Sequence, residues 1–149
     1  EDEDVVDRFD ELIKKYELTP DQIRVEITET AFAENPELLI RTTQRFHDIG
    51  VEVEMDDFGS GYSSLHMLKD VPVDRIKLDL LFLAESGDPE KGRTIVRHMI
   101  QLVDDLKISM IAEGVETADQ AEFLKSNGCS DIQGYYFYKP MPVEEFESL

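Results

Sequence analysis

Two adjacent aspartates, Asp56 and Asp57, end an alternating run in the stretch VEVEMDDFGSGYSSL at residues 51–65. Neighbouring carboxylates repel each other and resist removal from water, so such a pair at a strand end indicates bound water, a cation or a shared proton. The glycines that follow let the chain turn, so that both carboxylates can reach one metal cluster. Turns after strands also favour Asp and Gly, which makes this stretch alone a weak sign of a metal site.

Further acidic residues stand at or near the ends of the other alternating segments. They are Glu26, Glu29, Asp79, Glu113 and Glu116, with Lys77 among them. Carboxylates that gather without histidine or cysteine suit hard cations that bind oxygen, such as Mg²⁺ or Mn²⁺. A cation held there attracts phosphate and can activate water. Glu116, which precedes Thr117, also fits a plain helix start.

The composition excludes several classes of function. The 149 residues are 41% apolar, enough for one domain with a core, and their net charge of −19 argues against binding a long nucleic acid. The single cysteine, Cys129, excludes an internal disulfide and a cysteine zinc cluster, and we expect it to be a core thiol. No apolar run is long enough to span a membrane and no signal peptide is visible, so we expect a cytoplasmic segment, whose parent protein can still be anchored upstream.

Five strands alternate with helices along the chain. Strands are predicted at 24–28, 51–56, 75–79, 108–113 and 131–134, and helices within 5–16, 35–50, 62–70, 89–106 and 117–128. Asn35 before Pro36 is typical of a helix start, and Thr117 with Gln120 forms a capping box. Alternating strands and helices indicate a parallel sheet with right-handed crossovers.

Each predicted strand has one apolar and one polar side. Val25 opposes Glu26, and Ile76 opposes Lys77. The inner strands of a doubly wound sheet are apolar on both sides, so these polar sides favour a shared lumen, as in a barrel of parallel strands with its chemistry at their C-terminal ends. A closed barrel needs eight strands and about 250 residues. We therefore predict an α/β fold, a partial (β/α)₈ TIM-type barrel in which residues 1–149 supply the last five parallel strands with their helices.

Five motifs in order resemble the EAL-type cyclic-di-GMP phosphodiesterase domain across nearly the whole chain. They are VEITET, MDDFGSGYSSL, PVDRIKLD, IAEGVET and GCSDIQGYYFYKPMP. The resemblance implies a modified (β/α)₈ barrel that hydrolyses cyclic-di-GMP to linear pGpG with two divalent cations, Mg²⁺ or Mn²⁺. It also implies upstream sensory or GGDEF domains in the parent protein.

The resemblance assigns roles residue by residue. It implies metal-site or water-activating carboxylates at Glu26, Asp56, Asp57 and Glu113, with Lys77 next to the attacking water and Glu113 able to remove a proton. It implies that Gln133 lies near the substrate and that Asp79 supports the substrate site. Glu29 is expected to steady the glycine loop, and Glu116 to support it.

The chain departs from the family pattern at its start and at Leu80. The Glu-Ala-Leu tripeptide and the asparagine of the next strand are absent, so two metal ligands are missing. Leu80 stands where many members carry Arg. We therefore expect an N-terminally truncated domain that is inactive alone and that associates with itself or with the missing part of the barrel. Two alternatives remain: a non-catalytic module that binds cyclic-di-GMP or a protein, and a receiver-like five-stranded signalling domain, which strand parity disfavours.

The aromatic run YYFY at 135–138 is expected to pack rather than to stack bases.

Overall fold

The computed structural model describes residues 4–59, 64–80 and 88–149. Within these ranges one sheet contains β1 (Arg24–Thr28), β2 (Glu52–Phe58), β3 (Arg75–Asp79), β4 (Ser109–Glu113) and β5 (Asp131–Ile132). The helices are α1 (Asp4–Lys15), α2 (Glu29–Glu34), α3 (Pro36–Asp48), α4 (Ser64–Asp70), α6 (Pro89–Asp105), α7 (Ala118–Ser126) and α8 (Val143–Phe146), and a 3₁₀ turn covers Pro20–Gln22. None of these described helices is long and apolar enough to cross a membrane.

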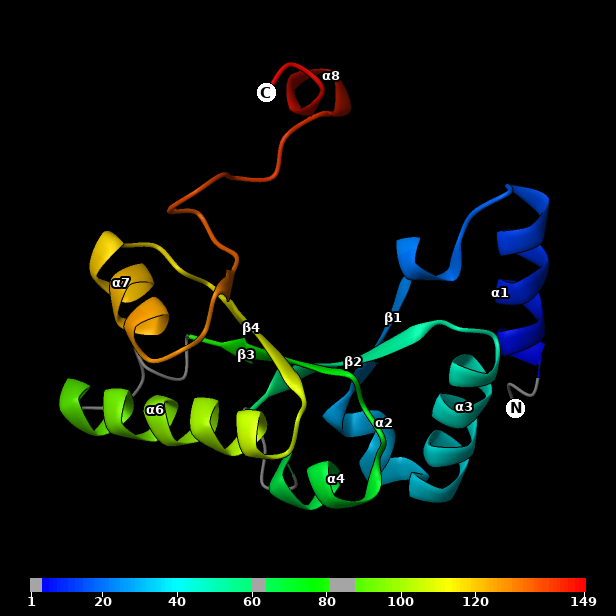
Figure 1. The fold of residues 1–149 in the computed structure, drawn as a ribbon, viewed down its shortest axis with the longest axis horizontal. Coiled ribbons are helices and arrows are strands. Elements are labelled where there is room, and N and C mark those ends of the chain that lie inside the picture. Colours follow the sequence, from blue (N-terminus) through cyan, green and yellow to red (C-terminus); the bar gives the residue numbers. More distant parts are fainter. Residues whose placement is uncertain (1–3, 60–63, 81–87) are drawn as a thin grey trace.

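The strands lie side by side in their order along the chain, and every neighbouring pair is parallel. Right-handed crossovers between successive neighbours leave all the connecting helices on one side of the sheet. Figure 1 shows them along the outer side of a curved sheet, with α8 beyond its open inner side. A receiver-like domain has the strand order 2-1-3-4-5, so that alternative is wrong. The predicted barrel-type arrangement of five parallel strands is confirmed.

The outer side of the sheet is the apolar side, and the core forms between it and the helices. Val53, Met55, Ile76, Leu78 and Ala112 each have 0% of their surface exposed. Buried helical side chains cover them, among which are Phe46 of α3, Met67 of α4, Val96 of α6 and Leu124 of α7. Cys129 belongs to this core, and burial raises the pKa of its thiol to about 11. The expected core thiol is confirmed.

Local hydrogen bonds begin the helices where the sequence signals predict. Asn35 Oδ1 accepts from the backbone N–H of Leu38 at 3.1 Å, and α3 follows with Pro36 in its first turn. Thr117 and Gln120 form the predicted capping box of α7. These bonds satisfy N–H groups that have no partner inside the helix.

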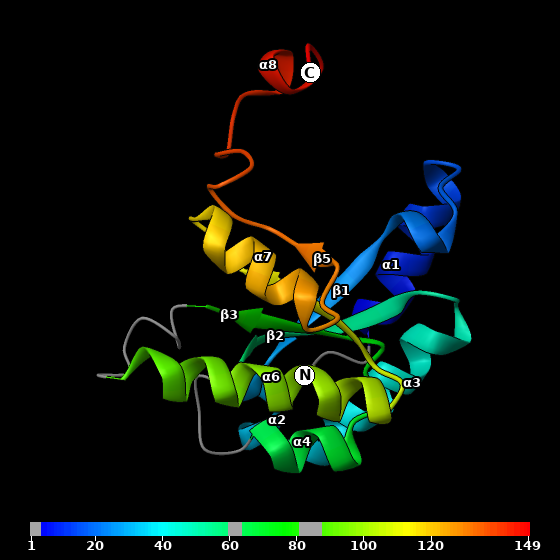
Figure 2. The same ribbon diagram turned by 60° about the vertical axis from the view of Figure 1, so that its left-hand side comes forward.

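Two groups of large apolar side chains lie exposed. On α1, Val6 and Ile13 are buried, whereas Leu12 and Tyr16 are 46% and 61% exposed, because α1 packs on α3 over a narrow stripe. Residues 135–138 are 40–62% exposed, so the expectation that this aromatic run packs is wrong. They follow β5 on the segment that leads away from the sheet toward α8, as both views show (Figure 2).

Gly134 is required because the chain passes very close to itself after β5. A Cβ at this position would meet Val115 O at 2.2 Å and Val115 N at 2.3 Å. The N–H of Tyr136 donates to the same Val115 carbonyl at 2.9 Å, and the N–H of Val115 donates to Gln133 O at 3.2 Å. This contact joins the segment after β4 to the end of β5 and sets the place of Gln133.

We predict that Gly134→Ala lowers the free energy of unfolding by roughly 3 kcal/mol or more, the upper end of overpacking effects, because backbone atoms must move. Gly128→Ala is the control: its φ is +97°, but its Cβ would meet Ile100 at an ordinary 4.0 Å. The control should cost only about 1–2 kcal/mol, the penalty for a left-handed residue. Urea denaturation measures both, and equal losses would contradict the steric explanation.

The sheet has open edges among the described residues, where β1 and β5 each have only one strand neighbour. Unpaired strand edges attract other strands. We therefore predict that the 149-residue chain, purified alone, forms dimers or larger species or associates with added N-terminal barrel strands. Light scattering during size-exclusion chromatography tests this. A compact, soluble and long-lived monomer would refute it.

Candidate functional site

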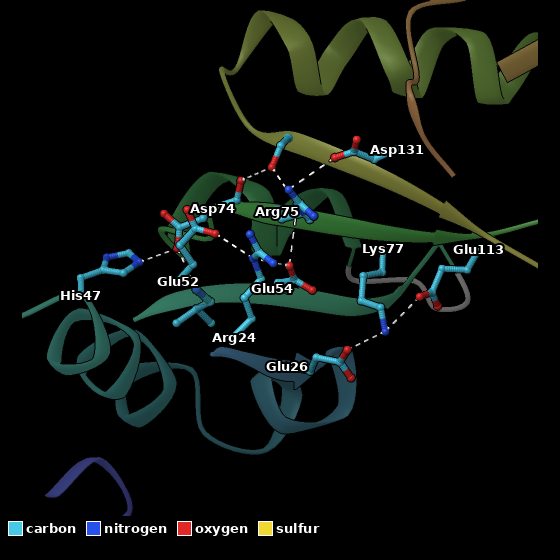
Figure 3. A network of polar contacts seen from close by, with 12 residues as sticks. Arg24, Glu26, His47, Glu52, Glu54, Asp74, Arg75, Lys77, Glu113 and Asp131 are labelled. Atoms are coloured by element: carbon cyan, nitrogen blue, oxygen red, sulfur yellow. Dashed lines mark hydrogen bonds and ion pairs between the residues drawn. The ribbon is translucent and has the colours of Figure 1, made fainter. Parts of the chain in front are cut away.

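The ammonium group of Lys77 lies among carboxylates from three neighbouring strands. Its Nζ is 2.8 Å from Glu26 Oε1 of β1, 2.9 Å from Asp56 Oδ1 of β2 and 3.1 Å from Glu113 Oε1 of β4. Figure 3 shows the Lys77 side chain between Glu26 and Glu113. Only 12% of the Lys77 side chain is exposed. We call these four side chains the Lys77 cluster.

A β-bulge places the two aspartates opposite Lys77. Met55 pairs with Ile76 and Phe58 pairs with Leu78, so Asp56 and Asp57 together face the single residue between them on β3. Asp57 has a φ of +55°, a left-handed conformation that Asp tolerates better than most residues. Bulges of this kind redirect side chains at functional sites. The chain therefore departs from an extended strand at Asp57 itself, two residues before the first glycine of the predicted turn.

The electrostatics of the Lys77 cluster keep the lysine charged. Burial alone lowers the pKa of Lys77, but its hydrogen bonds to the Glu26 and Asp56 carboxylates and the negative charge of Glu113 outweigh burial and hold that pKa above the ordinary lysine range. For Glu113, burial raises the pKa of the carboxyl against the opposing influence of Lys77. A raised pKa makes the Glu113 carboxylate a stronger base than an ordinary glutamate.

One oxygen of the Lys77 cluster keeps an unused lone pair. Glu113 Oε1 is buried, and although Lys77 Nζ is 3.1 Å away, this ion pair lacks the alignment of a hydrogen bond; no other described group donates to it. A buried carboxylate oxygen without a donor is costly. It is therefore an acceptor that a cation or a bound donor can use.

A second group of charges lies on the same inner side, nearer the start of the strands. Glu54 is only 7% exposed and pairs with Arg24 at 3.2 Å and with Arg75 at 3.7 Å. Arg24 also contacts Glu52 at 2.8 Å, and Arg75 contacts Asp131 at 3.4 Å (Figure 3). These pairs link four strands. None of these residues was predicted as a site residue from the sequence, although they share the strand parity of Glu26 and Lys77.

A pocket of about 740 Å³ adjoins the Lys77 cluster at the C-terminal ends of β3, β4 and β5. Its polar lining includes Asp79, Glu113, Glu116 and Gln133, and its apolar lining includes Tyr135, Tyr138, Met141, Val143, Phe146 and Leu149. Asp79 also approaches the backbone at Gly114, where a Cβ would lie 3.2 Å from Asp79 Oδ1. The two residues expected near substrate, Asp79 and Gln133, thus share a pocket with Glu113.

The remaining site predictions have mixed outcomes. Asp57 is exposed and lies outside the Lys77 cluster. Glu116 precedes α7, where its backbone N–H donates to Gln120 Oε1 at 2.9 Å, as expected of a helix start. The side chain of Glu29 and residues 60–63 lie outside the described residues, so the role of Glu29 on the glycine loop stays a prediction. Leu80 is buried in the core at 2% exposure.

The acidic side chains of the Lys77 cluster suit a hard divalent cation, because they offer carboxylate oxygens as ligands and one of these oxygens accepts no hydrogen bond. Their positions, however, are set by contacts with Lys77 and not by a metal ion. Among the described residues, no three Asp, Glu, His or Cys side chains are arranged to hold one metal ion. The site thus suits a cation chemically, but the carboxylates are turned toward Lys77.

Comparisons with known proteins agree on one family. Cyclic di-GMP phosphodiesterase PdeR of Escherichia coli K12 is 42% identical over 125 residues, which are 84% of this chain and 19% of the relative. Signaling protein YkoW of Bacillus subtilis 168 is 34% identical over 146 residues, 98% of this chain and 18% of the relative. The chain therefore spans about a fifth of the length of these curated relatives.

Solved structures show the same fold. The EAL domain of Mycobacterium smegmatis DcpA matches with a TM-score of 0.90 and 35% identity, over 99% of this chain and 66% of that chain. The PaMucR phosphodiesterase, solved as a c-di-GMP complex, matches with a TM-score of 0.87 and 32% identity, over 97% of this chain and 59% of that chain. The family model described as EAL domain matches residues 1–140. The chain belongs to the EAL domain family.

Proposed function

We propose that this chain is the C-terminal part of a cyclic-di-GMP phosphodiesterase domain, a metal-dependent hydrolase that acts in cyclic-di-GMP signalling and yields linear pGpG. The observation that carries the proposal is the Lys77 cluster, in which three strands present carboxylates and one lysine beside a large pocket. Relatives named as cyclic-di-GMP phosphodiesterases, and a related phosphodiesterase solved as a c-di-GMP complex, support it.

The proposed cation site consists of Glu26, Asp56, Asp57 and Glu113, which would hold two divalent cations, Mg²⁺ or Mn²⁺, in the whole domain. When bound, such cations supply a Lewis acid that activates water and neutralises a phosphodiester. The acidic surface makes that neutralisation necessary, because a chain with a net charge of −19 repels a dianionic nucleotide.

The chain's own residues orient the reactants. Lys77, kept protonated by its partners, donates to a water facing the phosphorus, and the Glu113 carboxylate accepts a proton from that water. The new P–O bond forms as the bond to the ribose O3′ breaks in line, and the O3′ takes up a proton, which leaves a 5′-phosphorylated linear dinucleotide. Gln133 and Asp79 contact the nucleotide in the pocket, while Glu29 and Glu116 support the glycine loop.

The alternative is a module that binds cyclic-di-GMP without turning it over. It is favoured by the Lys77-centred geometry, since the described acidic residues form no three-ligand metal site while the pocket beside them remains. Binding without cations would favour this alternative. Binding that depends on cations and is followed by hydrolysis favours the phosphodiesterase.

In the protein that carries the whole domain, we predict that Asp56→Asn and Asp57→Asn each lower kcat at least about a hundredfold, because each removes one charge from the cation site and displaces a cation. Asp105→Asn, an exposed acid at the end of α6, is the matched control and should leave turnover unchanged. Separation of cyclic-di-GMP from pGpG by chromatography measures all three. If either Asp56→Asn or Asp57→Asn retains turnover, the assigned cation site is wrong.

For the 149-residue chain alone, we predict no hydrolysis at a rate comparable with a whole domain, even in excess Mg²⁺ or Mn²⁺, because two metal ligands of the family pattern are absent from these residues and a two-metal site needs both cations in place. Nucleotide binding in the pocket should outlast catalysis. The same chromatographic assay decides this. Rapid conversion to pGpG that is lost in Lys77→Ala would show that the described five strands suffice for catalysis.

A further inference from the structure

Lys77 lies where a metal ion would be expected. The carboxylates of Glu26, Asp56 and Glu113 converge on its ammonium at 2.8–3.1 Å, whereas the described acids form no group that could share a metal ion. Three carboxylates and one ammonium leave the Lys77 cluster with a formal charge of −2, from three acidic groups and one basic group. A divalent cation would balance that charge.

The ammonium group is needed to hold these strand ends together. Three carboxylates gathered in a partly desolvated place repel one another unless a cation lies between them. No other described basic side chain contacts them: Arg24 and Arg75 pair with Glu54 in the second charged group. Without a metal ion, Lys77 is therefore the cation that offsets the repulsion between β1, β2 and β4.

A metal ion would compete with the ammonium for the same oxygens. A divalent cation binds carboxylate oxygens more closely than an ammonium group does, and two cations side by side repel each other. The Glu113 Oε1 oxygen, which has no aligned donor, is the first that an entering ion could use. Each further carboxylate that turns to the ion has to leave Lys77.

We propose that Lys77 is an internal stand-in for the metal: it holds the carboxylates of β1, β2 and β4 together in the metal-free protein and weakens metal binding, because the ion must draw those carboxylates away from it. The inference rests on the proposed cation site. It adds that Lys77 sets the metal concentration at which the site loads, apart from any contact that this residue makes with water or substrate.

The test uses the protein that carries the whole domain and compares the wild type with Lys77→Met, Lys77→Arg and Arg75→Met. Lys77→Met removes the competing charge and keeps a long side chain, Lys77→Arg keeps the charge, and Arg75→Met removes a charge from the same side of the same strand without touching the cluster. Thermal unfolding in EDTA reports the metal-free stability. Mn²⁺ binding, followed by the electron paramagnetic resonance signal of free Mn²⁺, reports affinity without an activity assay.

We expect Lys77→Met to unfold several degrees below the wild type in EDTA, to bind Mn²⁺ about tenfold or more tightly, and to gain more thermal stability from Mn²⁺ than the wild type gains. Lys77→Arg should bind Mn²⁺ about as weakly as the wild type. Arg75→Met should lose stability with less than about a threefold change in Mn²⁺ affinity.

The outcomes separate the two proposals. If the wild type binds Mn²⁺ and Lys77→Met binds it equally or more weakly, the stand-in role is wrong and the cation site stands. If neither protein binds Mn²⁺, both are wrong. A measurement on the wild type covers a variant that fails to fold: the Lys77 ammonium resonance, observed by ¹⁵N NMR in EDTA, should shift when Mg²⁺ saturates the protein, and an unchanged resonance would overturn the inference.

Discussion

Carboxylates on neighbouring parallel strands can share one side of a sheet only if cations lie between them. In this chain, Lys77 meets that constraint at the C-terminal ends of β1, β2 and β4, and Arg24 with Arg75 meets it nearer the start of the strands. The inner side of the sheet is therefore a charge-paired layer in which each basic group serves more than one acid. Its shape and its chemistry depend on the same ion pairs.

The opposite side of the sheet keeps that layer in place. On β2 and β3 the apolar residues that alternate with the charged ones are fully buried under the helices, so a slip of one residue in register would expose the core and bury the charges. The bulge at Asp56 and Asp57 is the local exception. It adds one residue opposite Lys77 without disturbing the pairing of Phe58 beyond it, so Asp56 contacts Lys77 while Asp57 beside it stays exposed and the core does not move.

Residue patterns predicted the elements better than they predicted the contacts. The alternation of apolar and polar residues, as in Val25 and Glu26, was sufficient to predict the parallel strands, and capping residues such as Asn35 helped to predict most of the helices. Both patterns involve residues that are close neighbours in the chain, so they can be seen in one sequence. The short helices α2 and α8 were missed, since neither has enough turns to show a periodic apolar face. The bulge, the burial of Glu54 and the central place of Lys77 depend on register between distant segments, which one sequence does not display.

On this description, the ion pairs of Lys77 hold the inner side of the sheet together without a metal ion. A double-mutant cycle of Lys77→Met and Glu113→Gln, with the free energy of unfolding measured by urea denaturation in EDTA, tests it most directly. Groups that interact show coupling energies of roughly 0.5–3 kcal/mol. We expect a coupling of at least about 1 kcal/mol, because without Lys77 the partly buried Glu113 carboxylate has no cation beside it. If the losses of unfolding free energy in the two single variants add up to the loss in the double variant to within about 0.3 kcal/mol, the two residues are not coupled and this description is wrong.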